Sequence, residues 1–236
     1  MGRDKTKVFK VVGTIIFSVL ILGGFGYLLW KGEPLEKRYL AFATVALPFL
    51  FALLYIGKNL KKLFITLALA CHVAAYYFMA IDDNCGTPRY KWIGLFILCG
   101  AQLFFMLYTF TLAKGNGARV INLAFRAALC LVAWLILPKY LTLTKMQLVA
   151  VIYAINLLTT TLVALLHIKT EWLTFIGVLV LLVCHLHVGF VNGGIEVLNL
   201  TGKFADFLTK RDWASYIYVP SLYLIALSSV WAKKKK

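Results

Sequence analysis

The sequence has few acidic residues, and none of them lies in the interior of an apolar run. Aspartate and glutamate together occupy nine of 236 positions, against 25 lysines and arginines. The nine are Asp4, Glu33, Glu36, Asp82, Asp83, Glu171, Glu196, Asp206 and Asp212. Because carboxylates deep in the membrane are the usual proton relays of pumps and transporters, this pattern argues against a proton-coupled carrier that uses an acidic pair.

A disulfide framework is also missing. The five cysteines are an odd number, and four of them, Cys71, Cys99, Cys130 and Cys184, lie inside apolar runs, which leaves Cys85 as the loop cysteine. Thiols in such surroundings behave as small hydrophobic side chains. The count and the placement therefore exclude a secreted scaffold held together by disulfides.

Charged residues of either sign are scarce, at 14%, whereas hydrophobic residues reach 62%. A soluble domain is about half apolar and about a quarter charged, so the composition predicts an integral membrane protein. The formal charge of +16 does not indicate nucleic acid as a partner, because the basic residues form short clusters between apolar runs. Such clusters are typical of interfacial anchors and orientation signals. We expect membrane lipids as the surroundings.

Eight apolar runs are long enough for spans, because a hydrocarbon core of about 30 Å needs about 20 helical residues. Helices satisfy their own backbone groups in lipid. The first run is too long for a signal peptide and is expected to be retained. With no internal repeat, the sequence predicts one domain over 1–236, an all-α bundle of eight transmembrane helices with no predicted oligomeric state. The predicted spans are 8–30, 39–56, 63–81, 92–113, 121–138, 148–168, 172–191 and 213–231.

The orientation follows from the basic residues between the spans and near their ends. The amino terminus, the carboxyl terminus and the second, fourth and sixth loops together carry 14 lysines and arginines, whereas the other loops carry 10. Arg126, inside the fifth run, is the remaining one of the 25, and it either extends to the interface or pairs locally. Since cytoplasmic loops are the more basic, both termini are expected to be cytoplasmic.

Histidines are the least expected polar groups in the apolar runs. The stretch CHLHVGFVNGG, Cys184 to Gly194, places His185 and His187 at the outer end of the seventh run, and His72 lies near the middle of the third. An uncharged imidazole in hydrocarbon still needs a partner for its N–H group. On a regular helix His185 shares a face with Gly189 and Asn192. The stretch is therefore predicted to line a polar pocket, the alternative being a pair of histidines satisfied by packing.

Other runs bring neutral polar groups to a similar depth. Tyr153, Asn156 and Thr160 lie on one face of the sixth run, a pattern that also arises from hydrogen bonds between helices. The candidate ligand-binding residues are Tyr76, Gln102, Tyr153, Asn156, Thr160, His187, Asn192, Tyr218 and Ser221.

No cofactor is predicted, and zinc is the alternative. His185 and His187 lie about 200° apart on a helix and cannot both bind one ion unless the helix is broken. The pairs Cys71-His72 and Cys184-His185 would supply two thiols and two imidazoles. That spacing matches no zinc motif.

Four stretches resemble the YhhN or lysoplasmalogenase-like membrane proteins. GLFILCGAQLFFMLYTF, from Gly94, is similar to the family's fourth span, with Gln102 and Phe105 in place of His-x-x-Tyr. VAVIYAINLL contains Tyr153 at the family's sixth-span tyrosine. GVLVLLVCHLHVGF and YVPSLYLIALS resemble the seventh and last spans. The resemblance implies an eight-helix bundle with cytoplasmic termini that cleaves the vinyl ether bond of a lysophospholipid.

The chain departs from this family at its acidic positions. The seventh-span Ser-Asp becomes Cys184-His185, the last-span Ala-Gln becomes Pro220-Ser221, and the third-span Ser-x-x-Gly-Asp has no clean counterpart in CHVAAYYFMAIDD. Tyr76 or Asp82 stands nearest the first family aspartate, and His185 replaces the second. The candidate catalytic residues are His72, Asp82 and His185.

The sequence leaves three functions open. Vinyl ether hydrolysis needs a proton donor to carbon and a base that activates water, which His185 would share with His72 or Asp82. The alternative is a protein of the same fold that binds or transports an amphipathic molecule without breaking it, as loss of the acidic pair would suggest. A structural subunit is a third reading.

Overall fold

The structure is a computed structural model that describes residues 3–31, 38–81, 87–189, 191 and 213–231. All regular elements in these ranges are helices. They are α1 (Arg3–Lys31), α2 (Arg38–Leu54), α3 (Leu60–Tyr76) with its π-helical extension η2 (Tyr77–Ile81), α4 (Pro88–Leu112), α5 (Asn116–Tyr140), α6 (Lys145–Leu166), α7 (Ile168–Gly189) and α10 (Trp213–Trp231). Six of them are long and apolar enough to cross a membrane, and α2 and the described part of α10 are shorter apolar helices. The prediction of an all-α, multi-pass membrane protein is confirmed at this level.

The helix ends agree with the predicted spans to within a few residues, with one difference that affects a polar group. The segment Lys169–Glu171, assigned to a loop from the sequence, belongs to α7, which begins at Ile168. The helix is interrupted at Glu171, where φ is −121° and ψ is 20°. The preceding helix ends at Leu166, so the connection between α6 and α7 is too short to carry Glu171 away from the bundle.

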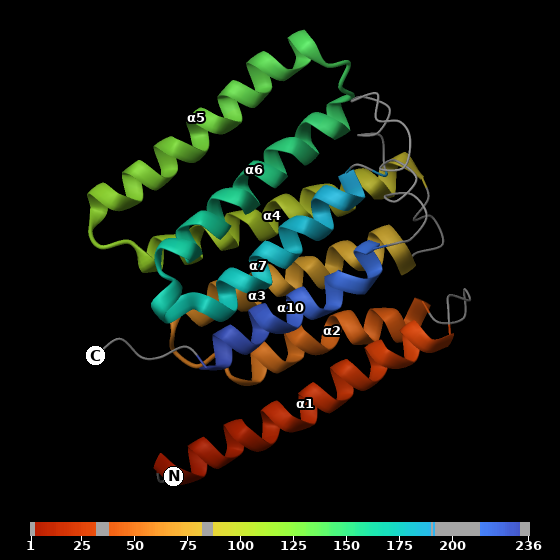
Figure 1. The fold of residues 1–236 in the computed structure, drawn as a ribbon, viewed down its shortest axis with the longest axis vertical. Coiled ribbons are helices and arrows are strands. Elements are labelled where there is room, and N and C mark those ends of the chain that lie inside the picture. The colour runs from red at the N-terminus through yellow and green to blue at the C-terminus, as the bar shows by residue number, and fades with distance from the viewer. Residues whose placement is uncertain (1–2, 32–37, 82–86, 190, 192–212, 232–236) are drawn as a thin grey trace.

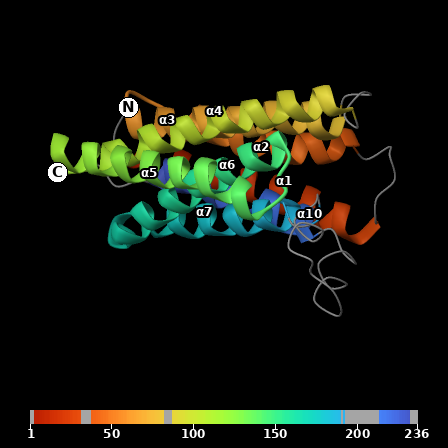
Figure 2. The same ribbon diagram turned by 90° about the horizontal axis from the view of Figure 1, so that it is seen from above.

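The helices run along one common direction (Figure 1, Figure 2), and α1 and α5 lie at opposite edges of the bundle (Figure 1). The start of α1 lies beside the end of α10, because Lys10 Nζ donates to the carbonyl of Val230 at 3.2 Å and Trp231 Nε1 donates to Thr14 Oγ1 at 3.2 Å. This end of the bundle is called the terminal end below, and the other the distal end.

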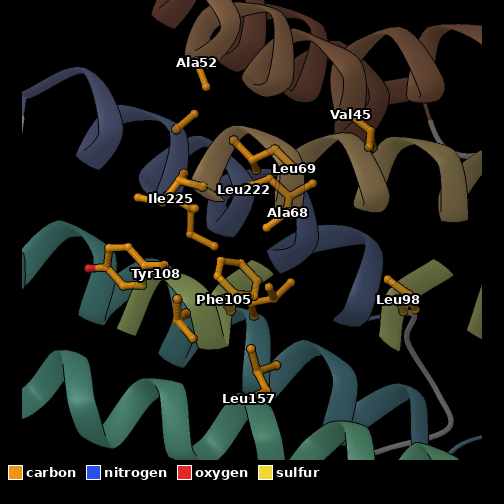
Figure 3. Packing of buried hydrophobic residues seen from close by; sticks show 14 of the residues in the cluster. Val45, Ala52, Ala68, Leu69, Leu98, Phe105, Tyr108, Leu157, Leu222 and Ile225 are labelled. Carbon is orange, nitrogen blue, oxygen red and sulfur yellow. The ribbon is translucent and has the colours of Figure 1, made fainter. Parts of the chain in front are cut away.

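The core lies between α2, α3, α4, α6, α7 and α10. Phe105, Leu157, Leu222 and Ile225 are fully buried there (Figure 3). The helices α7 and α10 approach closely at Gly177, where a Cβ atom would lie 3.0 Å from the backbone nitrogen of Ile225. Since residue 177 is a glycine, no side chain separates α7 from α10 at this point. The close approach also brings the distal halves of the two helices together.

The edge helices are the exception to this burial. In the most apolar 18-residue stretch of each helix, only 6% of the residues of α1 and 11% of those of α5 are buried inside the protein. The corresponding share is 39% for α3, α6 and α7. The exposed side chains of α5 are large and apolar, among them Ile121, Leu131 and Trp134. Such surfaces suit hydrocarbon, in agreement with a membrane location.

Candidate functional site

Two histidines and two tyrosines meet in the distal half of the bundle. The rings of His72 on α3 and His185 on α7 have centroids 5.9 Å apart. Tyr218 on α10 lies 5.9 Å from His72 and 6.0 Å from His185, and Tyr153 on α6 makes an edge contact with His185 at 4.8 Å. The structure therefore brings together these four side chains, which come from four separate helices.

Three further side chains surround these rings. Gln102 on α4 is buried, and its side-chain amide lies near the Tyr153 hydroxyl but outside hydrogen-bond geometry. Phe105, one turn further along α4, lies 6.1 Å from His72, and Tyr76 stacks on Tyr218 at 6.1 Å with ring planes 18° apart. The site defined by His72, Gln102, Tyr153, His185 and Tyr218 is called the histidine site below.

The histidine site contains buried polar atoms that have no hydrogen-bond partner. They are Nε2 of His72, Nε2 and Oε1 of Gln102, the hydroxyl of Tyr153 and Nε2 of His185. No other buried side-chain nitrogen or oxygen in the described ranges lacks a partner. An unsatisfied buried polar group costs about 1–3 kcal/mol, and native proteins retain few of them without a reason. Their concentration at one place distinguishes the histidine site from the rest of the described core.

One hydrogen bond orders the site. Nδ1 of His72 lies 3.0 Å from the hydroxyl of Tyr218. If the tyrosine donates to Nδ1, the imidazole proton stands on Nε2 and that atom is a free donor; in the other tautomer Nε2 is a free acceptor. In either case Tyr218 fixes the orientation of the ring, so that the unpartnered nitrogen of His72 has a defined position.

The polar stripe of α6 divides between two places. Tyr153 joins the histidine site, but Asn156 and Thr160 contact Arg126 of α5 instead: Nη1 of Arg126 donates to the Asn156 carbonyl at 2.9 Å and Nη2 to Thr160 Oγ1 at 3.1 Å. Nε donates to Asn122 Oδ1 at 2.8 Å. Arg126 therefore pairs locally, one of the two alternatives that the sequence left open, and Asn156 and Thr160 serve that arginine.

The buried charge of Arg126 has a physical explanation. The side chain is 2% exposed, and its guanidinium reaches Thr109 in the last turn of α4. The carboxyl ends of helices carry partial negative charge, which stabilises a cation placed there. With neutral acceptors on its N–H groups, Arg126 attaches the edge helix α5 to the bundle.

Several other predicted residues lie apart from the histidine site. Ser221 is buried, but its hydroxyl donates to the Tyr218 carbonyl of its own helix at 2.6 Å. His187 is buried on α7 two residues beyond His185, and it makes none of the described ring contacts that join the site. Asp82 and Asn192 lie outside the described residues.

A second polar cluster was not predicted from the sequence. Lys61 at the start of α3 and Glu171 at the break in α7 form an ion pair, with side chains 15% and 5% exposed. The hydroxyl of Tyr108 donates to Glu171 Oε2 at 2.7 Å, and Thr174 lies 3.4 Å from the same oxygen. These four residues, the ion-pair cluster, lie at the terminal end. The available signal was the short predicted loop Lys169–Glu171, because a loop of that length keeps Glu171 against the bundle.

The ion-pair cluster and the histidine site share three helices. Lys61 and His72 lie on α3, Tyr108 and Gln102 on α4, and Glu171 and His185 on α7. Glu171 and His185 are about 21 Å apart along α7 at 1.5 Å per residue. The ion pair thus fixes the terminal ends of the helices that carry the histidine site, without contributing charge to it.

The zinc alternative gains no support. Among the described side chains, no three of histidine, cysteine, aspartate or glutamate come close enough to hold a metal ion. The histidine site offers neutral hydrogen-bond donors and acceptors instead.

Comparison of the chain with protein-family models, with curated proteins and with solved structures finds no match.

Proposed function

We propose that this protein binds the polar part of an amphipathic molecule in the histidine site, within the membrane. The observation that carries this proposal is the set of five unpartnered polar atoms on four buried or half-buried side chains from four helices. A bound molecule would satisfy them. The surrounding helices are long and apolar enough to cross a membrane. Such a ligand therefore reaches the site from lipid more readily than from water.

We propose further that all eight helices cross the membrane and that both termini are cytoplasmic. The contacts between Lys10 and Val230 and between Thr14 and Trp231 support an even number of crossings, because they hold the start of α1 beside the end of α10. The excess of basic residues on that side supports the orientation.

Reporter fusions test this topology. Fluorescent proteins that mature only in the cytoplasm, fused separately to the two termini, are expected to be bright in both cases. Fusion after Tyr140, between α5 and α6, serves as the control and is expected to be dark. Opposite signals from the two termini would contradict the eight-span topology.

Hydrolysis of a vinyl ether is the second candidate, and the histidine pair favours it. Two imidazoles with centroids 5.9 Å apart, one of them oriented by Tyr218, supply a proton donor and a base in one place. This would replace the two aspartates of the lysoplasmalogenase-like proteins that the sequence resembles. The substrate class would be a lysophospholipid with a vinyl ether chain, and the products an aldehyde and a glycerophospho-alcohol.

Aldehyde release separates the two candidates. If the protein is a hydrolase, purified protein in detergent releases aldehyde from a lysoplasmalogen, and His185→Ala and His72→Ala each lower kcat by at least 100-fold, as removal of a general acid or base does. Leu186→Ala, which changes an exposed neighbour of His185, is the matched control and keeps full turnover. Turnover that survives both histidine changes would exclude the histidine pair as its acid and base, and no turnover by folded protein would leave binding.

A further inference from the structure

We infer that the group held in the histidine site is an uncharged hydroxyl, the glycerol end of a single-chain lipid, and not a carboxylate or a phosphate. The inference rests on the proposed binding function and narrows the class of ligand. Three features of the site carry it: the balance of donors and acceptors, the distance to fixed charges and the aromatic surroundings.

The unpartnered atoms require both a donor and an acceptor from the ligand. The Gln102 amide offers two N–H donors and one carbonyl acceptor, and the Tyr153 hydroxyl can donate and accept. An anion without a proton accepts only. It would leave Oε1 of Gln102 unsatisfied and would repel that oxygen at short range. A hydroxyl group donates and accepts, so it can satisfy Gln102 and one imidazole at the same time.

The fixed charges of the bundle are already used elsewhere. Lys61 is paired with Glu171 at the terminal end, about 16 Å from His72 along α3 at 1.5 Å per residue. The guanidinium of Arg126 donates to Asn122, Asn156 and Thr160. No described lysine or arginine contacts the histidine site. A buried anion without a counter-charge costs far more free energy than a buried hydroxyl, so a neutral group is favoured.

Aromatic rings surround the same polar atoms. Tyr76 stacks on Tyr218, Phe105 lies 6.1 Å from His72, and Phe105 is fully buried. Such surfaces bury the carbon atoms beside a hydroxyl, as they do at binding sites that are mostly apolar with a few polar groups. A glycerol carrying one alkyl chain presents both parts.

A comparison of three ligands with the same chain length tests the inference. We would measure displacement of labelled 1-O-hexadecylglycerol from the purified full-length protein by unlabelled 1-O-hexadecylglycerol, hexadecyl phosphate and palmitate, at equal mole fractions in micelles. The neutral lipid is expected to bind at least tenfold more tightly than either anion. Gln102→Leu is expected to weaken its binding at least tenfold, whereas Leu103→Ala, on the exposed face of α4, leaves it unchanged.

The outcomes distinguish the inference from the function on which it rests. Equal or tighter binding of either anion would overturn the inference and leave the histidine site as a ligand site. Binding of none of the three lipids would count against the proposed function itself. Unchanged affinity in Gln102→Leu would overturn the assignment of the hydroxyl to this site. Tyr153→Phe, which removes one unpartnered hydroxyl, is the second variant, and the same loss of affinity is expected from it.

Discussion

Replacement of Glu171 by alanine is expected to lower the free energy of unfolding by about 3–5 kcal/mol, the usual cost of breaking a buried ion pair from one side. The change would leave the ammonium of Lys61, 15% exposed, without its carboxylate, and would remove the acceptor of the Tyr108 hydroxyl. Denaturant titration in mixed micelles measures the effect. Because the cluster joins α3, α4 and α7, the loss affects the bundle as a whole.

A combined variant shows whether the cost comes from the unpaired charge. Lys61→Met, Glu171→Leu and Tyr108→Phe together replace the polar groups by apolar ones of similar volume, and such replacements are often neutral. We expect most of the lost stability to return. A loss below about 1 kcal/mol in Glu171→Ala, the value typical of exposed pairs, would contradict the structural role given to the cluster.

Gln102→Leu is expected to have the opposite effect, raising the free energy of unfolding of the ligand-free protein by about 1–3 kcal/mol. Gln102 is 5% exposed and both polar atoms of its amide lack partners, so leucine removes a cost without leaving a cavity. Functional groups commonly reduce stability in this way. The same titration in mixed micelles, on ligand-free protein, measures the gain.

The matched control for Gln102→Leu is Thr161→Val on α6. The Thr161 hydroxyl is buried but donates to the Leu157 carbonyl at 2.9 Å. Its removal therefore relieves no unpartnered atom, and no gain in stability is expected. If Gln102→Leu destabilised the protein as an ordinary core substitution does, the amide would be a structural group, and the interpretation of the site would fail.

The apolar runs predict the helices well, because a chain segment in lipid must satisfy its own backbone hydrogen bonds. Twenty apolar residues bounded by charge, Gly or Pro leave the backbone of a lipid-embedded segment no alternative to a helix. The structure places a helix on each predicted run, and the ends differ by a few residues. The largest consequence of such a shift is at Glu171. The predicted seventh span begins four residues after the start of α7, so the prediction assigns Glu171 to a loop.

Side-chain partners are less predictable, because they depend on how helices rotate about their axes. Tyr153 and Asn156 share a face of α6 by periodicity, yet one contacts His185 on α7 and the other Arg126 on α5. Residues three apart point about 60° away from each other around the helix axis, which is enough to face different neighbours. The convergence of His72 and His185 could be anticipated from depth alone. The partner of Lys61 could not, because depth does not show which helices are neighbours.

The measurement that tests the central claim most directly is the lipid content of the purified protein. Wild type and Gln102→Leu would be extracted from the same membranes in mild detergent, and the lipids that remain bound would be identified by mass spectrometry at equal protein amounts. If the histidine site binds a ligand, a single-chain lipid with a free hydroxyl is enriched in the wild type and depleted in the variant. An identical lipid profile in two equally folded proteins would contradict the claim.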